Sequence, residues 1–226
     1  MDILIIICLV GLIYSTLGLN KQNKDLDKKI KLNNYYTNIS KNNYQFINVI
    51  DEYQKKYQNK DIVGILNIKE LNISSLIMQG SDNIYYLNHL ENKEDSIYGS
   101  LMLDYRTNFD NSKINIIYGH MSNSSATPFT QLEKYFSHNY QDIEIIGENS
   151  NYHYEVFSVF KVKKQETRHL KVYFNDDREY LEHLNWFKKM SIYQTNILLN
   201  YSDKILILQT CTKNSDEFIL VVAKKI

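Results

Sequence analysis

A series of short apolar runs, from residue 62 onward, most constrains the fold of this 226-residue chain. Each run is rich in Ile, Leu, Val or aromatic residues and is bounded by polar or turn-forming residues, a pattern typical of β-strands. Strands of this number and spacing predict a closed or nearly closed β-barrel, which leaves no sheet edge exposed. The eight runs are 62–68, 71–78, 99–104, 114–118, 143–146, 152–162, 205–211 and 218–223.

Three segments have helical patterns. Residues 127–136 begin with Thr127 as a candidate N-cap and Pro128 at the first helical position. Residues 176–190 begin with acidic residues and end with lysines, which predicts a long helix before the last two strands. Residues 21–60 lack Gly and Pro and carry apolar residues at loose helical intervals. They predict one or two amphipathic helices, and a plain stalk ahead of the barrel is the alternative.

Composition excludes several classes of function. The chain has 26 basic and 26 acidic residues without basic clusters, so no nucleic-acid partner is expected. Five of its histidines lack ligand spacing to one another or to a cysteine, so neither a metal site nor a cofactor is expected; they are His89, His138, His153, His169 and His183. The contexts of Cys8 and Cys211 differ too much for a disulfide between them. Cys211 is therefore a lone thiol in the predicted barrel.

Two predicted strands end in residues with complementary chemistry. The run 205–211 ends at Cys211, and the run 114–118 continues through Gly119 to His120. A thiolate is the reactive form of cysteine, and a nearby histidine can carry protons and favour that form. Taken singly, such a cysteine can be a small core residue and such a histidine a structural one. The pair nevertheless makes a cysteine–histidine active site a specific hypothesis.

Several segments resemble sortases, and class B sortases in particular. YGHM (118–121) followed by PFTQL (128–132) is similar to the sortase histidine segment, and LQTCT (208–212) is similar to the Thr-Leu-x-Thr-Cys signature. QGSDNIYYL (79–87), GSLMLDYR (99–106) and VVAK (221–224) resemble further class B segments, in the same order along the chain. The resemblance covers about residues 62–226.

This resemblance implies a mainly β fold with helices, namely a closed eight-stranded sortase-type barrel over 61–226 with a helical segment, 21–60, packed on it. It implies a cysteine transpeptidase that cleaves a C-terminal sorting signal of surface proteins and forms a thioacyl intermediate on Cys211. His120 would transfer protons, and the acyl group would pass to an amine of a cell-wall precursor or a pilin lysine. A papain-like hydrolase is disfavoured because its cysteine normally precedes its histidine in the chain.

One departure from the family pattern affects the expected activity. Alignment of the last strand places Phe218 where sortases carry an arginine that supports the substrate and the oxyanion. Lys213, Arg106 or Arg168 could supply a replacement cation, and backbone amides near Cys211, with Thr210 nearby, could carry more of the oxyanion. The alternative function is an impaired sortase-like module that binds sorting-signal peptides without turnover.

The first twenty residues suggest an attachment to the membrane. Residues 3–19 form an apolar run at the short end of what spans a bilayer, and no small-residue cleavage site follows them. We therefore expect an uncleaved single-pass anchor in 1–20. Five lysines follow the run and none precedes it, so the positive-inside rule favours a cytoplasmic body. The resemblance to sortases favours an extracellular catalytic domain at the cell membrane, and we adopt that localisation.

Overall fold

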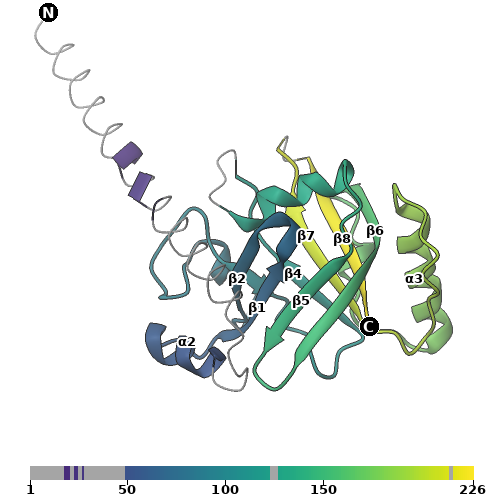
Figure 1. The fold of residues 1–226 in the computed structure, drawn as a ribbon, viewed down its shortest axis with the longest axis horizontal. Coiled ribbons are helices and arrows are strands. Elements are labelled where there is room, and N and C mark those ends of the chain that lie inside the picture. The colour runs from purple at the N-terminus through teal and green to yellow at the C-terminus, as the bar shows by residue number, and fades with distance from the viewer. Residues whose placement is uncertain (1–17, 21–22, 25–26, 28–48, 123–126, 214–215) are drawn as a thin grey trace, which may run out of the picture.

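The computed structural model describes residues 18–20, 23–24, 27, 49–122, 127–213 and 216–226. Its main body is an eight-stranded closed barrel flanked by two α-helices (Figure 1). The strands are β1 (Ile62–Ile68), β2 (Ile73–Met78), β3 (Leu101–Leu103), β4 (Ile114–Tyr118), β5 (Asp142–Gly147), β6 (Asn151–Lys163), β7 (Ile205–Cys211) and β8 (Glu217–Lys225). The barrel predicted from the apolar runs is confirmed.

The barrel closes in the order β1-β2-β3-β4-β7-β8-β6-β5. Most neighbouring strands are antiparallel, but β2–β3 and β4–β7 are parallel pairs. Parallel neighbours need long crossover connections. The chain between β4 and β7 provides one, and it contains β5, β6 and the long helix.

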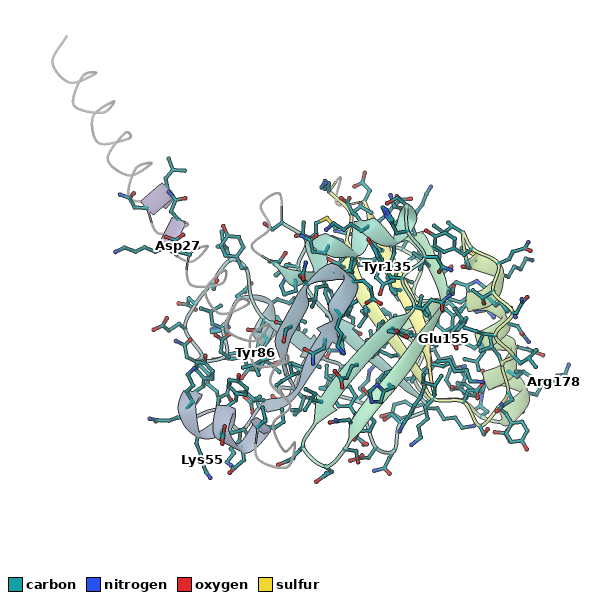
Figure 2. The ribbon with its side chains drawn as sticks, viewed as in Figure 1. Asp27, Lys55, Tyr86, Tyr135, Glu155 and Arg178 are labelled. Atoms are coloured by element: carbon teal, nitrogen blue, oxygen red, sulfur yellow. The ribbon has the colours of Figure 1, made fainter. Side chains whose placement is uncertain are left out.

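The α-helices cover opposite sides of the barrel (Figure 1). Helix α2 (Val49–Tyr57) packs through Ile50 and Tyr53 against the β1–β2 side. Helix α3 (Asp177–Met190) begins at Asp176, whose side chain caps it by accepting a hydrogen bond of 2.7 Å from the Glu179 amide. Figure 2 shows Arg178 on the outer side of α3, directed away from the barrel.

Within the described ranges, four 3-10 helices lie in the connections, and one of them corrects a prediction in detail. They are η2 (Lys69–Leu71), η3 (Tyr85–Leu87), η4 (Pro128–Phe136) and η5 (Arg168–Leu170). The segment predicted as a helix from Thr127 is the 3-10 helix η4, and Thr127 does not cap it through its side chain. Thr127 instead shares a hydroxyl–hydroxyl hydrogen bond of 2.9 Å with Thr130.

Side-chain alternation along β7 separates two hydrophobic cores. Leu206 and Leu208 face the barrel interior, where they join residues from the other strands. Ile205 and Ile207 face outward and pack beneath α3 with Leu184 and other α3 residues. Because successive strand residues point to opposite faces, the odd-numbered positions of β7, Cys211 included, lie on the outer face.

The structure corrects the predicted localisation. Within the described part of the chain, no helix is both long and apolar enough to cross a membrane. A span needs roughly 20 consecutive apolar residues. Of the apolar run 3–19, only Gly18 and Leu19 are described, so the predicted anchor lies almost entirely outside the described residues. The expectation of a single-pass membrane protein with an extracellular catalytic domain is therefore not supported.

Candidate active site

The parallel pair β4–β7 brings the two predicted reactive residues to the same edge of the barrel. Tyr118 is the register partner of Gln209, and the Gly119 amide donates a hydrogen bond of 3.1 Å to the Gln209 carbonyl. The observed register ends at this pair, and His120 and Cys211 each follow it by two residues. Cys211 ends β7 on its outer face, and His120 follows the end of β4 at the same edge of the barrel.

Gly119 is required at the bend that carries the histidine. A Cβ atom at this position would lie 2.6 Å from the side chains of both Leu101 and Phe129. Separations this short do not occur between real carbon atoms, so any larger residue would displace the chain or its neighbours. The glycine noted in the sequence thus allows β4 to approach η4 closely just before His120.

The hydrogen bonding of His120 defines which ring nitrogen is free. Its Nε2 atom lies 2.8 Å from the Leu87 carbonyl oxygen. A carbonyl oxygen only accepts hydrogen bonds, so Nε2 carries the proton in the neutral ring. Nδ1 is then the nitrogen available for proton transfer. Cys211 is a free thiol and is partly buried.

Phe218 lies directly opposite Cys211 on β8. Directly opposed residues in an antiparallel pair have Cβ atoms about 5 Å apart and project from the same face. Position 218 therefore lies on the same face as the thiol, and its aromatic ring packs into the core beneath α3. The Lys164 ammonium group lies 5.8 Å from the centre of this ring.

The three cations considered as replacements for an arginine have partners elsewhere. Lys213 forms an ion pair with Glu133 at 2.7 Å. The Arg168 guanidinium lies over the Trp186 ring at 4.9 Å, and Arg106 pairs with a buried carboxylate, described next. None of their described contacts involves Cys211 or Phe218.

Asp104 is the centre of a buried polar network below the site. Its carboxylate is 0% exposed and accepts hydrogen bonds from Arg106 Nε (2.9 Å), Arg106 Nη2 (2.7 Å) and the Tyr118 hydroxyl (2.7 Å). Burial alone would raise the pKa of Asp104, but the hydrogen bonds from Arg106 and Tyr118 bring it below its ordinary value of 3.8. Arg106 also donates to the Leu170 carbonyl at 3.0 Å. The network thus connects β4, two residues before His120, to η5.

Thr210 does not share the face of Cys211. It is buried, it pairs with the interior residue Ile219, and by alternation its side chain points into the barrel. Its hydroxyl has no hydrogen-bond partner within the described part of the chain. Any help from Thr210 to a group bound at the thiol must therefore come from its backbone.

Sequence reasoning missed two polar residues on the Cys211 side of the barrel. Gln209 precedes Cys211 by two residues and shares its face, a relation that strand alternation could have revealed. His169, treated in the sequence as one of several scattered histidines, is 0% exposed and lies edge-on to Phe218 at 6.0 Å between ring centres. Its approach to the site depends on how the β6–α3 connection folds, which no local pattern indicates.

Comparisons with known proteins identify the family. The family model described as the sortase domain matches residues 66–226, most of the chain. The chain belongs to the sortase family. This sortase is 31% identical over 163 residues to Sortase B of Listeria monocytogenes and 30% identical over 174 residues to Sortase B of Staphylococcus aureus. The matches cover 70% and 74% of this chain, and 65% and 70% of those two proteins.

Solved structures agree on the class B fold. The structure of a Staphylococcus aureus sortase B–substrate complex matches with a TM-score of 0.75 and 26% identity, over 95% of this chain and 98% of that one. Clostridium perfringens sortase B matches with a TM-score of 0.72 and 28% identity, over 78% of this chain and 99% of that one. The class B resemblance read from the sequence is confirmed.

Proposed function

We propose that this sortase is a cysteine transpeptidase whose nucleophile is Cys211 and whose proton carrier is His120. The observation that carries the proposal is the parallel pairing of β4 and β7, with the Gly119 amide bonded to the Gln209 carbonyl. It brings the ends of the two strands to one edge of the barrel, and this supports the pairing of a thiol and an imidazole from distant parts of the sequence. The barrel, 61–226, is the proposed catalytic unit, and 21–60 a helical segment accompanying it.

The proposed reaction has two halves that use the same pair of residues. The Cys211 thiolate attacks the carbonyl carbon of a peptide bond, and His120 gives a proton to the amine that leaves as the C–N bond breaks. A thioacyl bond to Cys211 remains. An incoming amine then attacks this thioester and loses a proton to His120, and the C–S bond breaks to release a new amide and the thiolate. No net oxidation or reduction occurs.

The proposed substrate is a protein carrying a C-terminal sorting signal, and the proposed acceptor is an amine of a peptidoglycan precursor or a pilin lysine. Membership of the sortase family supports both, as does the similarity to a sortase B bound to its substrate. Anchoring of surface proteins to a Gram-positive cell wall is the corresponding biological outcome.

A second candidate function follows from Phe218. An aromatic ring opposite the thiol offers neither charge nor a conventional hydrogen-bond donor to a developing oxyanion. Loss of one such donor costs on the order of 3 kcal/mol in comparable sites, or about a hundredfold or more in rate. The barrel could on this basis bind sorting-signal peptides without turning them over.

Incubation with a library of sorting-signal peptides, followed by mass spectrometry of the intact protein, tests the proposal. We expect a thioacyl adduct on wild-type protein, none on Cys211→Ala, and almost none on His120→Ala, with unchanged circular dichroism in both variants. His153→Gln, an exposed histidine on β6, is the matched control. Peptide binding without an adduct would favour the binding module, and an unchanged adduct in Cys211→Ala would exclude the nucleophile.

A further inference from the structure

Gln209 and His169 are two buried polar residues near Cys211 whose side chains have atoms without a hydrogen-bond partner among the described residues. Gln209 and Cys211 lie two positions apart on one face of β7, a separation of about 7 Å along the strand. Gln209 is 7% exposed, and its carboxamide oxygen has no hydrogen-bond partner among the described residues. A side-chain amide is long enough to reach a group covalently held on the neighbouring sulfur.

His169 approaches the same place from η5. Its imidazole packs against Phe218, which is opposite Cys211 and diagonal to Gln209 across the β7–β8 pair. Neither ring nitrogen has a hydrogen bond of ordinary length to a described residue. Burial lowers the pKa of His169, and a weak interaction with the Gln209 side chain offsets part of this decrease. The ring is therefore neutral near pH 7, with one N–H to donate.

Two unsatisfied groups side by side are costly in a folded protein. A buried donor or acceptor without a partner costs about 1–3 kcal/mol, and natural proteins retain few of them. Phe218 supplies an apolar wall there, so local packing does not explain the polar pair. A hydrogen bond from the His169 N–H to the Gln209 carboxamide oxygen would give each residue a partner and leave the Gln209 NH₂ group to donate elsewhere. A peptide carbonyl attached to Cys211 is an acceptor for that group.

We propose that Gln209 contacts the substrate by donating a hydrogen bond from Nε2–H to the carbonyl oxygen of the peptide that acylates Cys211, and that His169 is its positioning residue. This inference rests on the proposed transpeptidase function. The His169 N–H donates to the Gln209 carboxamide oxygen, which fixes the amide with its NH₂ group toward the thiol. A neutral amide thereby takes over the role for which Phe218 has no suitable group.

The chemistry of the step is compatible with this assignment. When the thiolate adds to the carbonyl carbon, the carbonyl oxygen becomes an oxyanion, and a donor that is already oriented stabilises it without reorganisation. A side-chain amide is an established type of donor for this purpose, and its loss lowers kcat by about 10²–10³-fold in comparable sites. His169 acts on the carbonyl only through Gln209, so its replacement should cost less.

The test measures two reactions of the same thiol. Thioacyl formation with an accepted peptide needs the carbonyl to be held, whereas alkylation of Cys211 by iodoacetamide does not. We expect Gln209→Met, which keeps the side-chain length but removes the amide, to lower the acylation kcat at least tenfold with little change in KM. The alkylation rate should stay within twofold of wild type, and His153→Gln should match wild type in both.

His169 provides an independent test if Gln209→Met is poorly folded. We expect His169→Phe to lower the acylation kcat about fivefold. His169→Asn and His169→Gln each place an amide N–H near one of the two ring nitrogens, and one of them should restore most of the lost rate. A purely structural role for the histidine would be served at least as well by phenylalanine.

Each outcome has a defined meaning. Wild-type acylation rates in Gln209→Met or His169→Phe would overturn the assignment and leave the transpeptidase function intact. Equal losses of acylation and alkylation would also overturn it, because the effect would then lie in the thiol or the fold. Failure of the wild-type protein to acylate with any peptide would remove the proposed function and this inference together.

Discussion

Acid should destabilise this protein through His183, on the inner side of α3. The imidazole is buried among aromatic rings, with ring centres 4.6 Å from Phe187 and 5.1 Å from Phe174. Burial lowers the pKa of His183 from its ordinary 6.5 to about 4, and the nearby charges of Arg168 and Lys171 add to the decrease. The folded protein therefore favours the neutral form of the His183 ring.

The sign and size of the effect follow from linkage. Below pH 6.5 the unfolded chain binds a proton at His183 that the folded protein does not, so the free energy of unfolding falls as pH falls toward 4. The full difference between the two pKa values corresponds to about 3 kcal/mol, at 1.36 kcal/mol per pKa unit. About 2 kcal/mol of this should already be lost at pH 5.

Urea denaturation at pH 7.5 and pH 5 measures the effect, with His183→Phe as the comparison. This variant removes the titration and keeps an aromatic ring in the cluster, so its loss of stability between the two pH values should be smaller by about 2 kcal/mol. Working above pH 5 avoids most carboxylate titration. Burial also lowers the pKa of His169, so some pH dependence should remain in the variant. The same pH dependence in both proteins would refute the reasoning.

Three further predictions concern the site and its support. Gly119→Ala should lower the free energy of unfolding, measured by urea denaturation, by about 1–3 kcal/mol and should slow acylation, because the added methyl group would lie 2.6 Å from Phe129. A variant as stable as the wild type would contradict this close contact. Asp104→Asn should lower the free energy of unfolding by about 3 kcal/mol, since it leaves Arg106 without its buried carboxylate; a loss below 1 kcal/mol would mean that the pair contributes little. Phe218→Arg should raise the rate of thioacyl formation about tenfold by adding a donor opposite the thiol; an unchanged rate would show that the oxyanion needs no donor from this position.

The barrel could be predicted because each strand has a recognisable apolar pattern in its own short stretch of sequence. The alternating Ile and Leu residues of β7 and the apolar run of β4 have recognisable strand patterns. β7 ends at Cys211, and β4 is followed by Gly119 and His120. The position of Phe218 opposite Cys211 could also be predicted, because β7 and β8 follow each other in the chain and pair in an antiparallel arrangement.

The rest depends on contacts between distant segments. Nothing near His169 in the sequence indicates that η5 lies against Phe218, because the path of the β6–α3 connection is determined by packing beneath α3. The partners of Lys213 and Arg168, which are Glu133 and Trp186, likewise come from other parts of the chain and could not be predicted. The 3-10 form of η4 was missed because helical caps and periodicity do not distinguish it from an α-helix.

Because β4 and β7 pair in parallel, modification of the Cys211 thiol can be used to follow folding. These strands are far apart in the chain, and contacts of this kind form late because the intervening chain must be ordered first. Until they pair, Cys211 and His120 lie in separate parts of the chain. The rate at which an alkylating reagent modifies Cys211 during refolding should therefore change as the barrel closes.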